Sequence, residues 1–285
     1  MKLTFLSDNT TEKSCCHAEW GLSILIESGG HKVLFDVGAS DMFARNAASL
    51  GVELGDVEAV ALSHGHYDHT EGMEAFCRLN SRVPIYIHRE AFGESYALDE
   101  NGNVEDRDYG LLWSRELIDR LQPRLVRTSG VTDINETMTL VGDIPLLDAY
   151  PMTEKFFRRA AGGAAEDGAA AARWVQDPMN HEQFLAVRED EGIFLFSGCS
   201  HKGVMSIIAR AQELFTGQKL RALIAGMHLY VLPKAQQAQI VNNICALGLE
   251  WVFPVHCTGM EAIVMFKERL GEKCVIASAG QSYEL

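Results

Sequence analysis

The feature that most constrains this chain is a group of histidines with one aspartate between residues 61 and 72. The segment reads ALSHGHYDHTEG, and its His-x-His-x-Asp-His motif consists of His64, His66, Asp68 and His69. An apolar run precedes the motif and a helix-like run, residues 73–79, follows it, which predicts a turn between a strand and a helix. Three imidazoles this close would repel one another when protonated, so a bound cation explains their grouping better than a polar loop does.

The ligand types in this motif suit divalent transition metals. Gly65 allows a sharp bend, so that His64 and His66 can converge on one ion, while Asp68 and His69 are placed for a second ion. Zinc, manganese and iron all accept imidazole and carboxylate ligands. We therefore expect two divalent metal ions, zinc in the first place, with manganese and iron as alternatives.

The order of apolar runs favours an α/β layer fold. Short runs bounded by turn residues predict strands at 3–6, 22–26, 32–35, 57–62 and 85–87, with a helix at 40–52 that ends near Gly51. In the last third of the chain, predicted strands at 193–196, 222–225 and 251–255 alternate with predicted helices at about 204–215 and 234–247. Such alternation is typical of sheets covered by helices.

The middle of the chain is less regular. We interpret residues 89–177 as an insertion into a single domain that spans residues 1–285. The insertion contains the Gly/Ala-rich segment AAGGAAEDGAAAAR at residues 160–173. A segment of this composition predicts either a lid over a site or a surface loop.

Three more histidines follow predicted strands late in the chain. They lie in SGCSH (197–201), GMHL (226–229) and PVHCTG (254–259). In open α/β sheets, functional groups collect beyond the carboxyl ends of the strands. We therefore expect His201, His228 and His256 to lie at the same sheet edge as the first motif.

Charge and hydropathy exclude several classes of partner. The formal charge of −14, with no basic run beyond Arg158 and Arg159, argues against nucleic acid. The chain lacks an apolar stretch long enough to span a membrane, and its first residues do not read as a secretory signal. Seven cysteines without regular spacing indicate a reducing, cytoplasmic setting. Bound cations would still allow a small anionic substrate; the oligomeric state is left open.

At these motifs the chain resembles the metallo-β-lactamase superfamily. Within it, the chain is similar to the branch of the archaeal dihydropterin ribofuranosyl-aminobenzene phosphate synthase of methanopterin biosynthesis. The likeness runs from SDNT at 7–10 through GLSILIE at 21–27 and LFDVG at 34–38 to the histidine motifs. It implies a four-layer αββα fold, in which two mixed sheets lie between helices and one or two metal ions bind at one sheet edge.

The resemblance also implies a set of metal ligands. These are His64 and His66 for the first metal, and Asp68, His69 and His256 for the second. The third ligand of the first metal is His201 or, alternatively, His181, which stands just before a predicted strand. Cys199 occupies the place where the superfamily usually has a bridging Asp or Cys.

Other positions are expected to act on the substrate or on the ligands. Asp68 would orient the nucleophile, and His228 would act as a general acid or polarise a substrate oxygen. Asp36 resembles a buried aspartate that orients the ligand loop. Trp20 replaces a histidine expected in this branch. The Asp8–Asn9 pair either lines the pocket or forms a strand-ending turn.

Three functions are compatible with these residues. The first is a metal-dependent hydrolase that acts on a small phosphorylated or ester substrate through metal-activated water. The second is a synthase that joins a pterin-like pyrophosphate to an aromatic ribonucleotide. The third is a redox di-iron protein or a non-catalytic, metal-dependent sensor.

Overall fold

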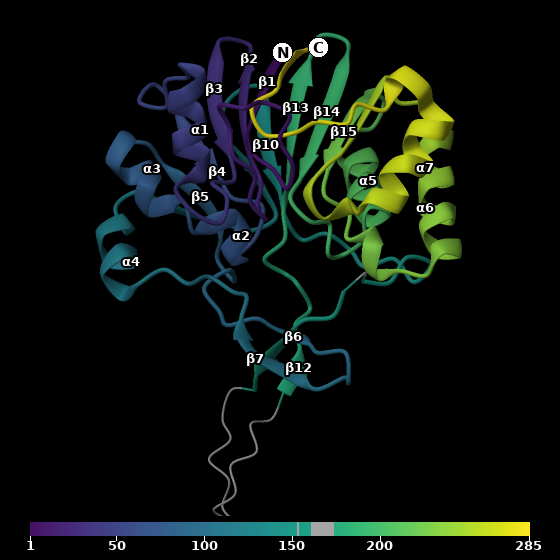
Figure 1. Cartoon of the computed structure of the whole chain (residues 1–285), viewed down its shortest axis with the longest axis horizontal. Coiled ribbons are helices and arrows are strands. Elements are labelled where there is room, and N and C mark those ends of the chain that lie inside the picture. Colours follow the sequence, from purple (N-terminus) through teal and green to yellow (C-terminus); the bar gives the residue numbers. More distant parts are fainter. Residues whose placement is uncertain (153, 161–173) are drawn as a thin grey trace, which may run out of the picture.

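The computed structural model describes residues 1–152, 154–160 and 174–285. Two β-sheets pack face to face, and helices cover the outer face of each sheet (Figure 1). The predicted four-layer αββα order is therefore confirmed. Within the described ranges, no helix combines the length and the apolar character needed to cross a membrane.

The first sheet has seven strands and carries the N-terminal half of the chain. In spatial order the strands are β17 (Ser282–Glu284), β1 (Lys2–Ser7), β2 (Ser23–Ser28), β3 (His31–Phe35), β4 (Ala59–Ala61), β5 (Ile85–His88) and β8 (Leu125–Thr128). Neighbours from β17 to β3 are antiparallel, and those from β3 to β8 are parallel. Its helices are α1 (Met42–Leu50), α2 (Tyr67–Thr70), α3 (Met73–Leu79) and α4 (Arg115–Leu121).

The second sheet has six strands. In spatial order they are β16 (Trp251–Pro254), β15 (Leu220–Ala225), β14 (Gly192–Ser197), β13 (Phe184–Glu189), β10 (Met138–Val141) and β9 (Val131–Asp133). Strands β14, β15 and β16 are parallel. Its helices and short 3-10 turns are α5 (Val204–Leu214), α6 (Lys234–Ala246), α7 (Met260–Leu270), η1 (Leu229–Val231), η2 (His256–Thr258) and η3 (Gly271–Lys273).

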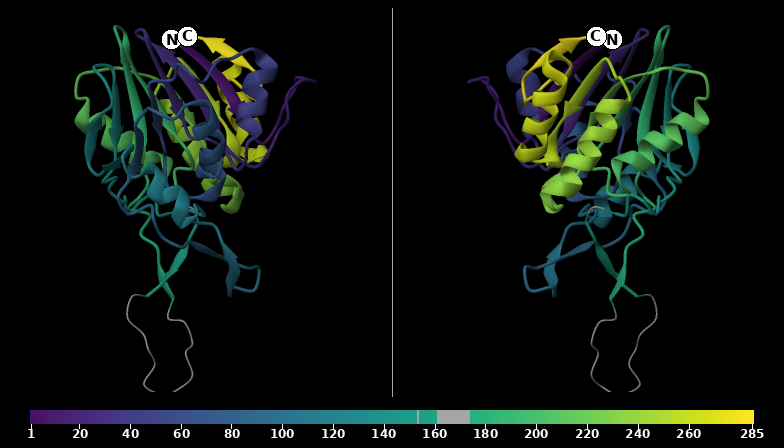
Figure 2. Two further views of the ribbon diagram at one scale, coloured as in Figure 1. Left: turned by 90° about the vertical axis from the view of Figure 1, so that its left-hand side faces the viewer. Right: turned by 90° about the vertical axis from the view of Figure 1, so that its right-hand side faces the viewer.

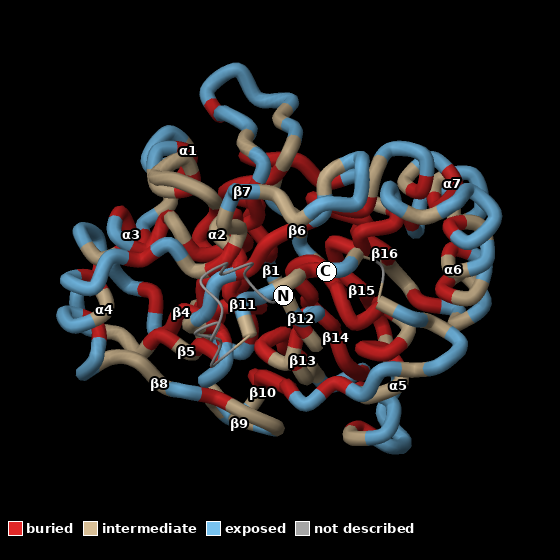
Figure 3. The backbone as a smooth tube through the Cα atoms, turned by 90° about the horizontal axis from the view of Figure 1, so that it is seen from below, coloured by how far each residue is buried: buried red, intermediate tan, exposed pale blue. Residues whose placement is uncertain are grey.

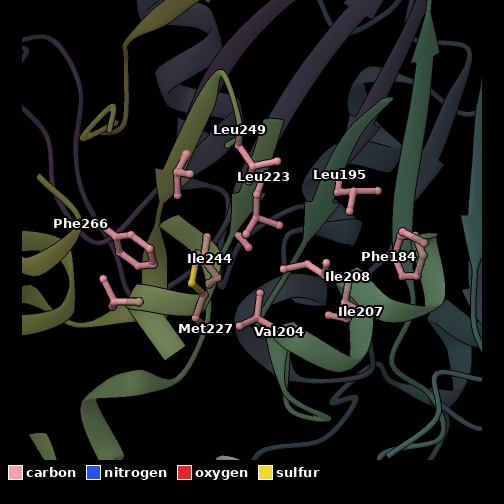
Figure 4. Packing of buried hydrophobic residues seen from close by; sticks show 14 of the residues in the cluster. Phe184, Leu195, Val204, Ile207, Ile208, Leu223, Met227, Ile244, Leu249 and Phe266 are labelled. Atoms are coloured by element: carbon pink, nitrogen blue, oxygen red, sulfur yellow. The ribbon is translucent and has the colours of Figure 1, made fainter. Parts of the chain in front are cut away.

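The strands of the second sheet are apolar on both faces because both faces are covered. On β14, Phe194 and Phe196 enter the core between the two sheets, whereas Ile193 and Leu195 belong to the cluster under the C-terminal helices. Figure 4 shows Leu195 in this second cluster, with Leu223 on the neighbouring strand. Burying one such side chain contributes about 1.5–3 kcal/mol. Buried positions follow the strands, and exposed positions follow the outer helix faces (Figure 3). The strand ends are thus fixed by packing on two sides.

The segment at residues 89–177 is only partly an insertion, so the predicted boundaries were too wide. Helix α4 and strands β8, β9 and β10 belong to the main layers. Strands β8 and β9 are edge strands that expose Arg127 and Asp133, so they lack the apolar run of a buried strand. The predicted Gly/Ala-rich segment lies, from residue 161 to 173, outside the described residues.

The rest of the segment forms a separate antiparallel sheet, which we call the projecting sheet. It consists of β12 (Trp174–Gln176), β11 (Phe157–Arg159), β6 (Tyr96–Leu98) and β7 (Val104–Asp108). The projecting sheet extends from one end of the sandwich, opposite the chain termini (Figures 1 and 2).

Candidate metal centre

The ends of strands from both main sheets bring the predicted histidines together. The ring centroid of His64 lies 4.6 Å from that of His66, 4.3 Å from that of His69 and 5.0 Å from that of His201. All four rings are buried. The first motif follows β4 and His201 follows β14, so the cluster bridges the two sheets.

The hydrogen bonds of their ring nitrogens distinguish His201 from His181 as the candidate third ligand. Nδ1 of His181 accepts a hydrogen bond from the Gly65 backbone N–H at 3.1 Å, and its Nε2 lies 3.8 Å from an oxygen of Asp177. His201 is fully buried, and neither of its ring nitrogens has a hydrogen-bond partner among the described residues. Its ring centroid is 4.8 Å from that of His66. The geometry therefore favours His201 as the companion of His64 and His66.

A second group lies beside the first. An oxygen of Asp68 is 3.3 Å from Nε2 of His256 and 3.9 Å from Nε2 of His69. The Cys199 Sγ lies 3.1 Å from Nε2 of His69. The same sulfur lies within 4.8 Å of ring nitrogens of His64 and His201 in the first group. It also lies within 4.8 Å of ring nitrogens of His69 and His256 in the second group. Cys199 thus lies between the two groups, at the position expected of a bridging residue.

The Asp36 carboxylate orients two of these histidines. Its oxygens accept hydrogen bonds from the Ser63 backbone N–H and hydroxyl, each at 2.7 Å, and from Nδ1–H of His69 at 2.7 Å. The Ser63 hydroxyl has one proton and donates it to Asp36, so it must accept from Nδ1–H of His64 at 2.9 Å. Nδ1 therefore donates in both imidazoles, which leaves Nε2 to face a metal. Nε2 of His64 has no hydrogen-bond partner among the described residues, and that of His69 lies 3.1 Å from Sγ of Cys199.

Asp8 and Asn9 hold the histidine on the far side of the cluster. An oxygen of Asp8 accepts from the His256 backbone N–H at 3.2 Å. The Asn9 side chain donates to the His256 carbonyl at 3.0 Å, and its oxygen lies 2.9 Å from Nδ1 of His256. Nε2 of His256 is again the nitrogen left free. These residues orient a ligand rather than only forming a turn.

Burial and neighbouring charge set the protonation of the cluster. Burial, reinforced by nearby histidines, lowers the pKa of His64 and His201 far below the usual value and that of His66 to about 3. Burial opposes ionisation of Asp68, but His69 and His256 outweigh it and lower the pKa of this carboxyl. At His69, burial is outweighed by the carboxylates of Asp68 and Asp36, which raise the pKa, so this ring would release a proton when a cation binds.

The backbone around the site is unusual for residues with side chains. Asp36, Ser200, His228 and His256 have φ angles of 57°, 57°, 45° and 50°, in the left-handed region. Residues other than glycine adopt this region at a cost, and such positions concentrate at functional sites. Each of the four lies just beyond a strand end, where the chain turns beside the cluster.

The donor set fits metal ions. In the described part of the chain, the buried nitrogens without a hydrogen-bond partner include Nε2 of His64, both ring nitrogens of His201 and Nε2 of His256. An unpartnered buried polar atom costs free energy, so several in one place indicate a missing ligand. His64, His66 and His201 would hold one ion, and Asp68, His69 and His256 a second. The mixture of imidazole, carboxylate and thiol does not choose the metal.

A cavity of about 450 Å³ opens beside the cluster. It is lined by Asp68 and His66 on one side, and by residues of the projecting sheet on another. His228 also lines it, and its Nδ1 lies 2.7 Å from a carboxylate oxygen of Glu154. Burial would lower the pKa of His228, but Cys257 and Glu154 outweigh it and raise the pKa. His228 thus lies at the cavity wall, and one of its ring nitrogens is also within 4.8 Å of donor atoms of His201 and Glu154.

Sequence reasoning missed several of these residues. Glu154 and Phe156 come from the irregular middle segment, where no periodic pattern marked them. Ser95 was also missed; its hydroxyl lies 3.1 Å from Nε2 of His66, which leaves Nδ1 of that ring for an ion. Trp20, singled out by its sequence position, lies at the cavity wall with its ring 5.3 Å from that of His256.

Comparison with known proteins identifies the family. The sequence model of the metallo-beta-lactamase superfamily matches residues 21–152, which include the first histidine motif. A crystal structure described as a metal-dependent hydrolase of the beta-lactamase superfamily has a TM-score of 0.81 and 29% identity, covering 100% of this chain and 99% of that one. The resemblance to the metallo-β-lactamase superfamily is thereby confirmed. Members of this superfamily are typically metal-dependent hydrolases.

Two curated relatives from Methanocaldococcus jannaschii match nearly the whole chain. One is an uncharacterized protein, 26% identical over 269 residues, covering 93% of this chain and 94% of its own length. The other is 7,8-dihydropterin-6-methyl-4-(beta-D-ribofuranosyl)-aminobenzene-5'-phosphate synthase, 28% identical over 296 residues, covering 98% of this chain and 94% of its own length. The resemblance to the synthase branch is therefore confirmed as a similarity.

The Asp36 network predicts the effect of a nearly isosteric change. In Asp36→Asn, the side-chain NH2 would face donors of Ser63 or His69 that now point at the carboxylate. Asparagine still tolerates the left-handed backbone at this position, so the main chain need not change. We expect zinc affinity to fall about 10–100-fold, measured by competition with a fluorescent chelator. Asp41→Asn, at an exposed aspartate that pairs with Arg45, is the control. Unchanged affinity in Asp36→Asn would contradict the orienting role.

The choice between His201 and His181 predicts different metal contents. In His201→Ala, the first group loses a ligand, so we expect bound metal to fall by about one equivalent per chain. His181→Ala should keep its metal, because both ring nitrogens of His181 already face protein partners. Elemental analysis by mass spectrometry after dialysis measures both variants. The opposite pattern would make His181 the ligand.

Proposed function

We propose that the chain is a metal-dependent hydrolase that acts on a small phosphorylated or ester substrate. The observation that carries this proposal is the convergence of unpartnered imidazole nitrogens and an ionised carboxylate beside an open cavity. A purely structural histidine cluster would use its ring nitrogens in protein hydrogen bonds. The similarity to a structure described as a metal-dependent hydrolase supports the same conclusion.

The chemistry follows from the positions of the chain's own residues. Divalent cations bound by the two ligand groups would supply Lewis acidity and lower the pKa of a water molecule toward neutrality. Asp68 lies 3.3 Å from Nε2 of His256 and faces the cavity, so it would orient the attacking water. The cavity volume of about 450 Å³ limits the substrate to a small molecule.

His228 would act on the leaving group. The Glu154 carboxylate, 2.7 Å from Nδ1, favours a proton on the ring. A protonated imidazole at the cavity wall can donate that proton to the departing oxygen. His228 therefore completes the reaction without binding metal.

A second candidate is a synthase reaction. It is supported by 28% identity, over 98% of this chain, to the M. jannaschii protein named as an aminobenzene phosphate synthase. In such a transfer the cluster would assist departure of pyrophosphate. Release of pyrophosphate only in the presence of a second, aromatic substrate would favour the synthase. Bound iron with an absorption band that changes on exposure to oxygen would favour the redox alternative.

Hydrolysis of nitrophenyl esters and phosphoesters tests the main proposal. We expect the purified protein to release nitrophenol from at least one of nitrophenyl phosphate, bis(nitrophenyl) phosphate and nitrophenyl acetate. Chelation should abolish this activity, because the proposed reaction needs the cations that the unpartnered nitrogens would bind. Adding zinc, manganese or iron(II) should restore it. Activity that survives complete metal removal would contradict the proposal.

Replacing His228 tests the assignment of the proton donor. We expect His228→Ala to lower kcat by about 10²–10⁴-fold, the usual contribution of general acid–base catalysis, with metal content unchanged. The exposed His17 provides a control, since His17→Ala should alter neither quantity. Loss of metal from His228→Ala would instead make His228 a ligand.

A further inference from the structure

The cavity beside the metal cluster has an aromatic wall. The rings that line it are Trp20, Tyr67, Tyr109, Phe156 and Tyr230. Trp20 is 46% exposed and Tyr230 47% exposed, and their rings meet edge to face at 6.1 Å. Large aromatic side chains exposed together at the mouth of a cavity are typical of a binding surface. These rings offer faces and edges on which a flat ligand could stack.

One cation faces the same cavity. Arg107, on β7 of the projecting sheet, places its guanidinium 4.9 Å from the ring centroid of Tyr67 and 4.8 Å from that of Tyr109. The arginine is exposed, and within the described ranges it forms no ion pair with a carboxylate. Its two aromatic neighbours fix the plane of the guanidinium but leave the charge unneutralised.

The carboxylates that line the cavity are already engaged. Glu105 accepts a hydrogen bond from the Tyr109 hydroxyl, Glu154 pairs with His228, and Asp68 lies among the histidines. Arg107 is therefore available to an anionic group that enters with a ligand. A guanidinium held flat binds carboxylate or phosphate oxygens in pairs.

We infer that Arg107 and the surrounding rings select substrates that combine a planar aromatic ring with an anionic group away from the bond that is cleaved. The inference rests on the proposed function and specifies its substrate class. The reacting group lies at the metal cluster, the ring stacks against the aromatic wall, and the second anionic group pairs with Arg107. Arg107 is a specificity-determining residue and takes no part in the bond cleavage.

The projecting sheet also supplies a matched control. Arg159, on β11, lies over two rings as Arg107 does, at 5.5 Å from the centroid of Tyr96 and 5.8 Å from that of Trp174. Arg159, however, pairs with Glu94 at 3.5 Å, and it does not line the cavity. Replacing either arginine removes one positive charge that lies over two aromatic rings of the projecting sheet or its neighbours. Of the two arginines, only Arg107 lines the cavity.

The test compares three phosphate monoesters with the metal-loaded protein. We expect kcat/KM to rise from ethyl phosphate to phenyl phosphate and again to 4-carboxyphenyl phosphate. Arg107→Gln should reduce the preference for the carboxyphenyl over the phenyl ester about tenfold, mainly through KM, since one charge-assisted contact is lost. Arg159→Gln should keep the wild-type preference. An unchanged preference in Arg107→Gln, or an equal loss in both variants, would overturn the inference.

A binding experiment separates this inference from the proposed function. Phenylphosphonate and 4-carboxyphenylphosphonate are not hydrolysed, and calorimetry measures their dissociation constants directly. If no ester is hydrolysed, the hydrolase proposal fails. Tighter binding of the carboxyphenyl compound that is lost in Arg107→Gln and kept in Arg159→Gln would still support the selection. Equal binding of both compounds to the wild type would contradict it.

Discussion

The hydrogen bonds of the Asp36 carboxylate are the constraint on which the rest of the site depends. Asp36 follows β3, whereas Ser63 directly precedes, and His69 ends, the motif that follows β4. By accepting from Ser63 and His69, the carboxylate joins two neighbouring strand ends and fixes the tautomers of two imidazoles. Asn9 does the same for His256 from β1. The lone pairs of three histidines are thus set before any ion binds.

The two sheets and the projecting sheet contribute different properties. Strands buried on both faces hold the ligand side chains rigidly, because Phe194, Phe196 and their neighbours leave no room for a shift. The projecting sheet is attached at one end of the sandwich and carries exposed residues such as Arg107. A rigid centre beside a cavity wall built from a separate sheet allows one reaction to be combined with different substrates.

Much of the fold, and the gathering of the histidines at one sheet edge, could be predicted because strong local sequence patterns indicate them. The first motif is compact, and His201, His228 and His256 each follow an apolar strand whose end the pattern locates. The choice between His201 and His181 depends on hydrogen bonds from distant residues, Gly65 among them, which spacing does not reveal. Edge strands β8 and β9, and cavity residues such as Glu154, lie in sequence without a regular period, so only the folded chain identifies them.

The central claim is that these strand ends are built to hold cations. Anomalous diffraction from crystals of the metal-loaded protein, collected on both sides of the zinc, iron and manganese absorption edges, tests it most directly. The account predicts one peak within bonding distance of His64, His66 and His201, and a second beside Asp68, His69 and His256. A well-ordered structure with no anomalous peak there, and with these rings turned away from one another, would contradict it.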